Sequence, residues 1–348
     1  MDTVNIEQKN KGLDILDLTK LILSFMVVAI HTGLFSPYLY PWVRLAVPLF
    51  FMISSFLFFK KVNSCQHSKE KVQALKTFVV RNLKLYAFWF VVLFPISGFL
   101  RGWFEMDGED AVVNIIINFF IGGTFVASWF ISALLIGVIV IFIAHKNNMN
   151  NTLLFVIGVI LYLLISIRSS YMFVFRDWTS MLYKVATYEA YMNSPINSFP
   201  AGIPWIIFGK LFADGYFSKI KIKPSAITLG VGSVLLFTEW FLVKHFSQKF
   251  DKDFYLMLLP CCLAIFNILI QLKPINLKYA KEMRKISVFV FASHGSLAPC
   301  LRYAFKYIGF TMPSVVIYLL TLIICVGAAI LVLLLGKYKY LSWLKYSH

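Results

Sequence analysis

Hydrophobic residues run along this chain in long stretches that short polar segments separate. A stretch of ~20 apolar residues is long enough to cross a bilayer as a helix. Ten stretches approach this length, at roughly residues 17–35, 43–59, 84–100, 128–144, 152–168, 199–214, 225–243, 254–272, 286–305 and 312–335. The pattern therefore predicts an all-α fold, a polytopic transmembrane helical bundle of about ten spans.

Two further segments interrupt this pattern. Residues 111–123 are apolar but too short to span, so we expect an interfacial or re-entrant helix there. The loop at about residues 169–198 is semi-polar and aromatic, and either caps an outward cavity or connects two spans. Since no change in composition marks a second domain, we expect residues 1–348 to form a single membrane-embedded domain that includes this non-cytoplasmic loop.

The composition strengthens the membrane interpretation. Hydrophobic residues make up 59% of the chain and charged residues 14%, with a mean hydropathy of +0.77. A water-soluble protein of this size could not cover so much apolar surface, whereas lipid does not require it to be covered. The five cysteines are odd in number and match no metal-binding spacing, so we predict neither a disulfide nor a metal site.

The net charge of +17 indicates an orientation rather than a nucleic-acid partner. Lys and Arg gather in the segments 60–84, 210–223, 273–285 and 337–345, which ten spans place on the side of the N-terminus. Cytoplasmic loops of membrane proteins carry this excess. We therefore expect a multi-pass protein of the cell membrane with both termini in the cytoplasm, membrane lipids around it and no nucleic-acid binding.

Ionisable residues inside the first span are the first candidates for function. Lys20 and His31 are separated by about three helical turns and so lie on nearly the same helix face. Intramembrane ionisable groups are rare and usually face the bundle interior or a wet cavity. Alternatively, His31 bonds a neighbouring helix or marks the outer interface, and Lys20 extends to the cytoplasmic surface.

The second and third spans add three cations. Arg44 lies at the outer end of the second span, where it either faces the cavity of His31 or anchors the interface. Arg81 and Lys84 are one helical turn apart at the cytoplasmic mouth of the third span. Two cations on one face could hold the phosphates of a ligand, or they could be topology-determining charges alone.

Polar residues near the outer ends of two later spans complete the candidates. Trp129 and Ser132 open the fourth span, and His294 lies in the outer half of the ninth. Two histidines at similar depth, His31 and His294, could converge on one cavity. We expect Arg44, Trp129, Ser132 and His294 to contact a substrate.

Several of these pieces, taken in order, resemble the membrane-bound acyltransferase 3 family. They are the Lys20–His31 spacing, AVPLFFMISSFLF at 46–58, the Arg81/Lys84 pair, SWFISALL at 128–135 and SHGSLAP at 293–299. The strings RLAVPLFFMIS and LKLY look especially like the membrane domains fused to serine or alanine racemases of glycopeptide resistance, which are associated with serine uptake. Because the tenth span lies close to His348, we expect a stand-alone relative or the membrane half alone.

The resemblance implies roles for particular residues. His31 matches the family histidine, and Arg81 matches the first residue of the family's Arg-x-x-Arg pair. Lys20 and Lys84 stand where the family has arginine, and Ser55 stands where its ISG-type motif has glycine. Lysine lacks the planar fork with which arginine binds phosphates. The resemblance thus implies catalytic roles for His31 and Lys20 and a donor site at Arg81 and Lys84.

The resemblance also implies a reaction, with alternatives left open. Family members typically use cytoplasmic acyl-CoA to acylate hydroxyls of sugars, lipids or wall polymers, so we expect acyl-CoA, most simply acetyl-CoA, as donor and a small molecule or glycan of the envelope as acceptor. His31 would act as general base or carry the acyl group. The alternatives are a domain that binds or transports a small amino acid such as serine, and a scaffold for envelope machinery. A cavity linking the cations to His31 would favour acyl transfer.

Overall fold

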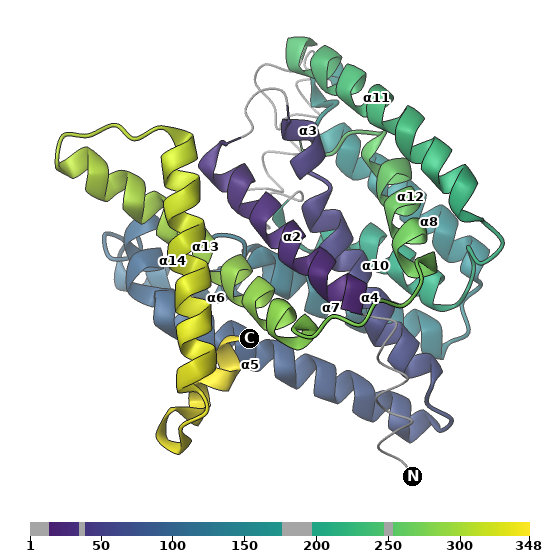
Figure 1. The fold of residues 1–348 in the computed structure, drawn as a ribbon, viewed down its shortest axis with the longest axis horizontal. Helices are drawn as coiled ribbons and strands as arrows, with labels where there is room; N and C mark the ends of the chain where they lie inside the picture. Colours follow the sequence, from purple (N-terminus) through teal and green to yellow (C-terminus); the bar gives the residue numbers. More distant parts are fainter. Residues whose placement is uncertain (1–13, 35–38, 176–196, 247–252) are drawn as a thin grey trace.

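The computed structural model describes residues 14–34, 39–175, 197–246 and 253–348, and within these residues the fold is entirely helical (Figure 1). The α-helices are α2 (Asp14–Thr32), α3 (Tyr40–Val43), α4 (Ala46–Asn63), α5 (Ser68–Leu100), α6 (Gly108–Ile117), α7 (Trp129–Lys146), α8 (Asn151–Arg168), α10 (Phe199–Ala213), α11 (Ile222–Phe246), α12 (Leu258–Gln271), α13 (Ala280–Tyr307) and α14 (Ser314–Leu335). Short non-α segments are η1 (Asn118–Gly122), η2 (Met172–Phe175) and η4 (Lys339–Ser347).

Every stretch predicted to span the membrane coincides with one of these helices. In the described part of the chain, seven helical segments are long and apolar enough to cross a bilayer: 14–32, 40–63, 68–100, 129–146, 151–168, 222–246 and 314–335. Helices α10 and α12 are apolar but shorter, and α13 carries several charges in its first two turns. The chain is thus an integral membrane protein with multiple helical spans, and the exact number of ten stays a prediction.

Helix α5 differs most from the prediction, because it begins at Ser68 rather than near residue 84. Its first half is amphipathic and polar, so it lacks the hydrophobicity that marks a span. The Glu70 carboxylate accepts from the backbone N–H of Gln66 at 3.1 Å and so satisfies a donor at the start of the helix. This polar half of α5 later proves to line a cavity.

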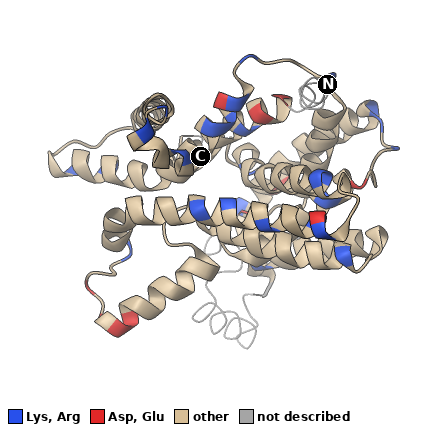
Figure 2. Ribbon diagram, turned by 90° about the horizontal axis from the view of Figure 1, so that it is seen from below, with Lys and Arg blue, Asp and Glu red and all other residues tan. Residues whose placement is uncertain are grey.

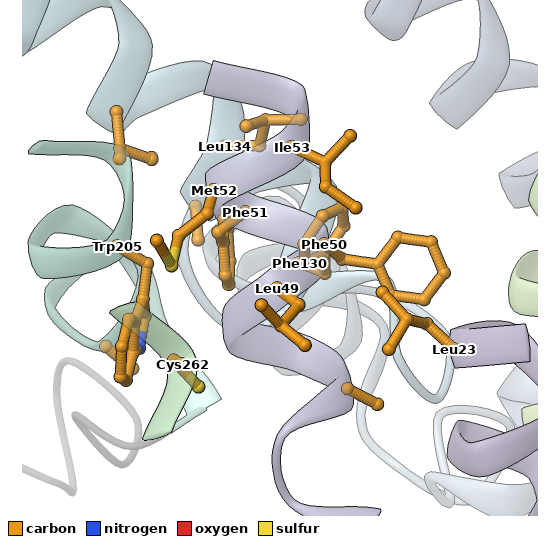
Figure 3. Close-up of a cluster of buried hydrophobic side chains, with 14 of the residues drawn as sticks. Leu23, Leu49, Phe50, Phe51, Met52, Ile53, Phe130, Leu134, Trp205 and Cys262 are labelled. Carbon is orange, nitrogen blue, oxygen red and sulfur yellow. The ribbon is translucent and has the colours of Figure 1, made fainter. Parts of the chain in front are cut away.

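Helix α4 forms the centre of the bundle and packs against α10. Within its spanning segment 72% of the residues are buried, against 22% for α11 and α14. Gly202 and Gly209 allow the close approach, because a Cβ at Gly209 would lie 2.5 Å from the Met52 carbonyl oxygen. Ser55 donates its hydroxyl proton to the Ile206 carbonyl at 2.6 Å and so binds α4 to α10. Aromatic and aliphatic side chains fill the space around α4 (Figure 3).

The long helices α11 and α14 lie at the periphery, on opposite sides of the bundle (Figure 1). Large apolar side chains on both are exposed, for example Val234 at 68% and Ile323 at 67%. In water such surfaces would be unfavourable, whereas hydrocarbon solvates them. These two helices therefore present lipid-facing surfaces, and α4, α7 and α10 form the interior.

The predicted short helix at 111–123 is present as α6 followed by η1. No residue of α6 is buried, and it is joined to the end of α5 by polar contacts. The Trp103 indole donates to the Asn114 side chain at 2.8 Å, and Arg101 donates to Asn118 at 3.2 Å. Most of the predicted loop 169–198 lies outside the described residues.

Candidate active site

A cavity of about 1170 Å³ lies among α2, α4, α5, α7 and α13. It is larger than most small-molecule sites, which measure roughly 300–1,000 Å³. The cations that line it come from four helices and are Lys20, Lys61, Lys69, Arg81, Arg284 and Lys285. The Glu70 carboxylate also lines it, so positive charge prevails at this cationic mouth. Cation-rich segments that are distant in sequence, 60–84 and 273–285, thus meet at one opening, and Figure 2 shows how few acidic residues accompany the Lys and Arg.

The inner end of this cavity is an aromatic layer made by Phe50, Phe130 and Phe291. The centroids of the three rings are 6.1 Å apart for Phe50–Phe130, 5.3 Å for Phe50–Phe291 and 5.0 Å for Phe130–Phe291. Each ring comes from a different helix, α4, α7 or α13. The cavity therefore changes from charged at its mouth to apolar at its end, as a ligand with an anionic head and an apolar tail would require.

A pair of histidines lies next to the aromatic layer. The ring centroids of His31 on α2 and His294 on α13 are 5.0 Å apart, and Phe291 lies 6.0 Å from His294. Helix α2 packs along α13, which brings the two rings together from distant parts of the chain. Neither histidine is among the residues lining the cavity, so the aromatic layer separates the pair from it.

The hydrogen bonds of His294 define its tautomer. Its Nδ1 lies 3.0 Å from the Val290 carbonyl oxygen, and because a carbonyl can only accept, Nδ1 carries the proton. Nε2 is then the acceptor, and it is fully buried without a partner among the described residues. His31 is exposed, whereas His294 is completely buried. The pair thus consists of the exposed imidazole of His31 and the buried imidazole of His294, whose Nε2 is available to accept a hydrogen bond.

The three cations predicted to be site residues near the cytoplasmic side, Lys20, Arg81 and Lys84, line two adjoining cavities. Lys20 and Arg81 line the cavity described above. A second cavity of about 650 Å³ adjoins it, and this one is lined by both Arg81 and Lys84. Lys84 also lies over the ring of Tyr346, 5.3 Å from its centroid. The structure therefore brings Arg81 and Lys84 to one cavity, whereas Lys20 lines only the larger one.

Arg44 lies at the end of the bundle where the histidines are, and its charge is paired. Its Nη2 is 2.6 Å from Oδ1 of Asp253, and the guanidinium lies 4.3 Å from the centroid of the Tyr40 ring. The Tyr40 hydroxyl donates to the same carboxylate at 3.0 Å. Within the Arg44 side chain, Nε is buried and has no hydrogen-bond partner among the described residues. Arg44 therefore joins the turn between α3 and α4 to the segment before α12.

Trp129 and Ser132 are engaged in packing rather than in lining either cavity. The Trp129 ring lies 6.0 Å from that of Phe51, and the Ser132 hydroxyl donates to the Trp129 carbonyl at 3.0 Å. Their neighbours Phe130 and Ile131 line the first cavity instead. The motif SWFISALL thus contributes to the site through its apolar residues.

Several cavity residues were missed because their roles are tertiary. Arg284, Lys285 and Lys345 indicated only the orientation, and no role was predicted for Tyr346 or His348, yet all five line one or both cavities. Burial and the nearby charge of Lys285 lower the pKa of His348, which keeps its ring neutral at pH 7. The clustering of cations at 273–285 and 337–345 was the available signal. The packing of the C-terminal segment against α5, which brings these residues to the cavities, could not be predicted from the sequence pattern.

Together these features define an integral membrane protein with a cationic cavity on one side of an aromatic layer and a histidine pair on the other. Residues 13–334 match the model of the acyltransferase 3 family, which is described as an acyltransferase domain, and the chain belongs to this family. Within the described ranges, no group of three or more His, Cys, Asp or Glu side chains is placed to hold a metal ion.

Two curated relatives are amino-acid racemases of Enterococcus faecalis. One is 25% identical over 278 residues, covering 76% of this chain and 37% of the relative. The other is 25% identical over 320 residues, covering 88% of this chain and 44% of the relative. The chain therefore spans less than half the length of the curated relatives it matches. No solved structure matches the chain.

Proposed function

We propose that this protein is an O-acyltransferase that moves an acyl group from acyl-CoA to a hydroxyl of an envelope component. Membership of the acyltransferase family supports an acyl donor and acyl transfer in general. The expected cavity linking the cations to His31 is not complete, because neither histidine is among the residues that line it. The observation that supports the finer proposal is that the larger cavity extends from a cationic mouth to an aromatic layer, and that Phe291 of this layer lies beside His294.

The cavity fits an acyl-CoA donor in both charge and polarity. Its mouth offers Arg81, Arg284 and Lys285 to phosphate oxygens, and charge-assisted hydrogen bonds of this kind are among the strongest in proteins. Arg284 is 3.6 Å from the buried Asp17 carboxylate, which holds it at the cavity wall. The apolar inner end would receive the acyl group. Because the mouth faces the side predicted to be cytoplasmic, the donor would enter from the cytoplasm.

His31 is the proposed general base. It would accept the proton of the acceptor hydroxyl while the oxygen attacks the thioester carbonyl carbon. A C–O bond then forms and the C–S bond breaks, and the proton passes from His31 to the departing thiolate, which gives an ester and free CoA. His294 would position His31, because its Nε2 can accept an N–H from the neighbouring ring and leave the other nitrogen of His31 free.

The aromatic layer would keep the two substrates apart until they react. Phe50, Phe130 and Phe291 would separate the cavity from the histidines, so the thioester would have to pass their rings to reach His31. The layer would also exclude water, which otherwise competes with the acceptor for the thioester.

A second candidate is the binding or transport of a small amino acid such as serine. It is favoured by the two relatives, which are named amino-acid racemases. Arg44 and Asp253 form an ion pair of 2.6 Å that offers partners for both a carboxylate and an ammonium group. The large cavity nevertheless opens at the cationic mouth, and its lining contains more cations than a single amino acid needs.

The decisive experiment compares acyl-CoA binding and turnover with serine uptake on one preparation. Purified protein in lipid nanodiscs is titrated with acetyl-CoA, and thioester cleavage is followed by the release of free thiol. Wild type is expected to bind and cleave the donor, and His31→Ala is expected to bind it equally well while cleavage is lost. His245→Ala is the matched control, because His245 is exposed at the end of α11 and lines neither cavity.

Two outcomes would contradict the proposal in different ways. If wild type binds no acyl-CoA but takes up serine in proteoliposomes, the transport candidate replaces the acyltransferase. If cleavage persists in His31→Ala, another group is the base, and acyl transfer stands without the role given to His31.

A further inference from the structure

The second cavity is built by three elements that are far apart in the sequence. Helix α5 contributes Lys76, Arg81 and Lys84, α13 contributes Lys285, and the C-terminal segment contributes Lys345, Tyr346 and His348. Five cations thus surround about 650 Å³, and among the described residues no Asp or Glu side chain lines this cavity. Unpaired like charges repel one another, so such a site is more favourable with an anion bound in it.

The two cavities form one continuous surface. Gln73, Thr77, Arg81, Lys285 and His348 line both of them. A ligand in the first cavity whose head extends past Arg81 would therefore enter the second. We expect this head to be anionic, because each of the three elements that line the second cavity contributes at least one cation.

An aromatic ring in the second cavity narrows the chemistry of this head. Tyr346 is exposed, and the ammonium groups of Lys84 and Lys345 lie 5.3 Å and 5.2 Å from its ring centroid. An accessible aromatic face flanked by cations suits a nucleobase attached to a phosphate, since bases stack on aromatic side chains. A lipid phosphate would use the cations and leave the ring without a role.

We propose that the second cavity binds the 3′-phosphoadenosine end of the acyl-CoA donor, and that the C-terminal segment Lys339–Ser347 forms one wall of this subsite. Tyr346 stacks on the adenine, Lys345 and Lys76 bind the 3′-phosphate, and Arg81 and Lys285 hold the diphosphate where the cavities join. This inference rests on the proposed function, because it presupposes an acyl-CoA donor.

The C-terminal segment is fixed firmly enough to serve as a wall. The Trp89 indole of α5 donates to the Ser347 carbonyl at 3.0 Å, and both residues are buried. The Trp343 ring lies 5.7 Å from Phe88, also on α5. The Ser347 hydroxyl is 3.1 Å from Nδ1 of His348, which orients that ring at the cavity. These contacts attach the segment to the helix that carries Arg81 and Lys84.

The test measures discrimination between CoA and 3′-dephospho-CoA, which lacks only the 3′-phosphate. With wild type in nanodiscs of neutral lipid, CoA is expected to bind at least about tenfold more tightly, the equivalent of one charge-assisted hydrogen bond. Lys345→Ala should weaken CoA binding and leave dephospho-CoA binding unchanged, so that the ratio of the two dissociation constants falls toward one, and the double variant Lys76→Ala/Lys345→Ala should bring it to about one. Tyr346→Ala should weaken both ligands by roughly tenfold, as the loss of one stacked base predicts.

Two variants of the same segment are matched controls. Lys339→Ala and Tyr340→Ala remove exposed residues that line neither cavity, so both should retain wild-type affinity and discrimination. A variant that merely misfolds would lose both ligands, whereas Lys345→Ala is expected to lose only the preference. The ratio therefore separates a specific effect from a loss of structure.

The failure of this inference is distinguishable from that of the proposed function. If wild type binds neither CoA nor dephospho-CoA, the proposed function fails and this inference falls with it. If it binds both equally, the donor site stands and the subsite is overturned. If anionic phosphatidylglycerol in the nanodiscs displaces CoA from wild type but not from Lys345→Ala, the cavity is a lipid-headgroup site and the inference is also wrong.

Discussion

Arg44 and Arg81, both predicted from the sequence to be site residues, lie at opposite ends of the bundle and differ in whether their charge is paired within the protein. Arg44, near the histidines, is paired with Asp253 at 2.6 Å and stacked on Tyr40. Arg81, at the cationic mouth, lines two cavities, and among the described residues it forms no ion pair. Charges are costly to bury, so a cation is either paired within the protein or kept for a ligand.

The same contrast extends to the surroundings of the two arginines. At the histidine end, Trp129 and Ser132 are used in packing, and the buried polar atoms without a partner among the described residues include the acceptor Nε2 of His294 and Nε of Arg44. At the mouth, cations from three elements line a cavity of about 650 Å³. Binding is therefore expected to depend on many residues at the mouth, and chemistry on very few at the histidine end.

Among variants that keep His31, removing His294 is expected to have the largest effect, and it tests whether the packed end carries chemistry. Because its Nε2 is proposed to hold His31 in position, His294→Ala should lower the transfer rate by about 10²-fold, in the range of acid–base contributions. Donor affinity should be unchanged. His294→Gln, which offers a carbonyl oxygen in place of Nε2, should recover part of the rate. The measurement is single-turnover acyl transfer with saturating donor.

A merely structural role for His294 would give a different result. In that case His294→Ala would lower the melting temperature and donor affinity together, and His294→Gln would not restore transfer selectively. The pH dependence of the rate provides a further readout, since a misoriented base changes its profile whereas loss of folded protein scales it uniformly.

Arg81→Ala is expected to have the next largest effect, and it acts on binding. Loss of hydrogen bonds to a charged partner costs ~2 kcal/mol, or roughly thirtyfold in donor affinity. Stability should change little, because Arg81 has no ion pair among the described residues to lose. Isothermal titration with CoA and a thermal unfolding curve measure the two quantities. Arg101→Ala, at the other end of α5, should leave donor affinity unchanged.

Arg44→Ala should show the reverse pattern, with a loss of stability and unchanged donor affinity. The pair with Asp253 is partly exposed, at 19% and 22%, so the expected cost is about 1 kcal/mol rather than that of a fully buried pair. A double-mutant cycle with Asp253→Ala measures the coupling directly. A large loss of donor or acceptor affinity in Arg44→Ala would instead show that the two ends are not divided as the contrast implies.

The spans could be predicted from the sequence, whereas the contacts that distinguish the two arginines could not. Apolar runs are a local property, so every predicted span falls on a helix. The polar first half of α5, from Ser68, was missed because amphipathic helices at a cavity lack that signal. The pairing of Arg44 with Asp253 and the arrival of Tyr346 beside Lys84 both join residues far apart in the chain. Such contacts are determined by packing, which hydropathy does not encode.

The smallest expected effect concerns Lys84, which stands where the family has arginine. Lys84→Arg, which introduces a planar guanidinium group, should strengthen donor binding by about threefold, because arginine can bind a phosphate through two parallel hydrogen bonds. The gain is small because Lys84 lies in the second cavity only and already contributes its charge there. Titration of CoA into wild type and Lys84→Arg measures it, with Lys339→Arg as a control for an added guanidinium that lies outside both cavities. A loss of affinity instead would mean that the ammonium of Lys84, 5.3 Å from the Tyr346 ring centroid, is matched to this ring, and that the mouth has adapted to lysine.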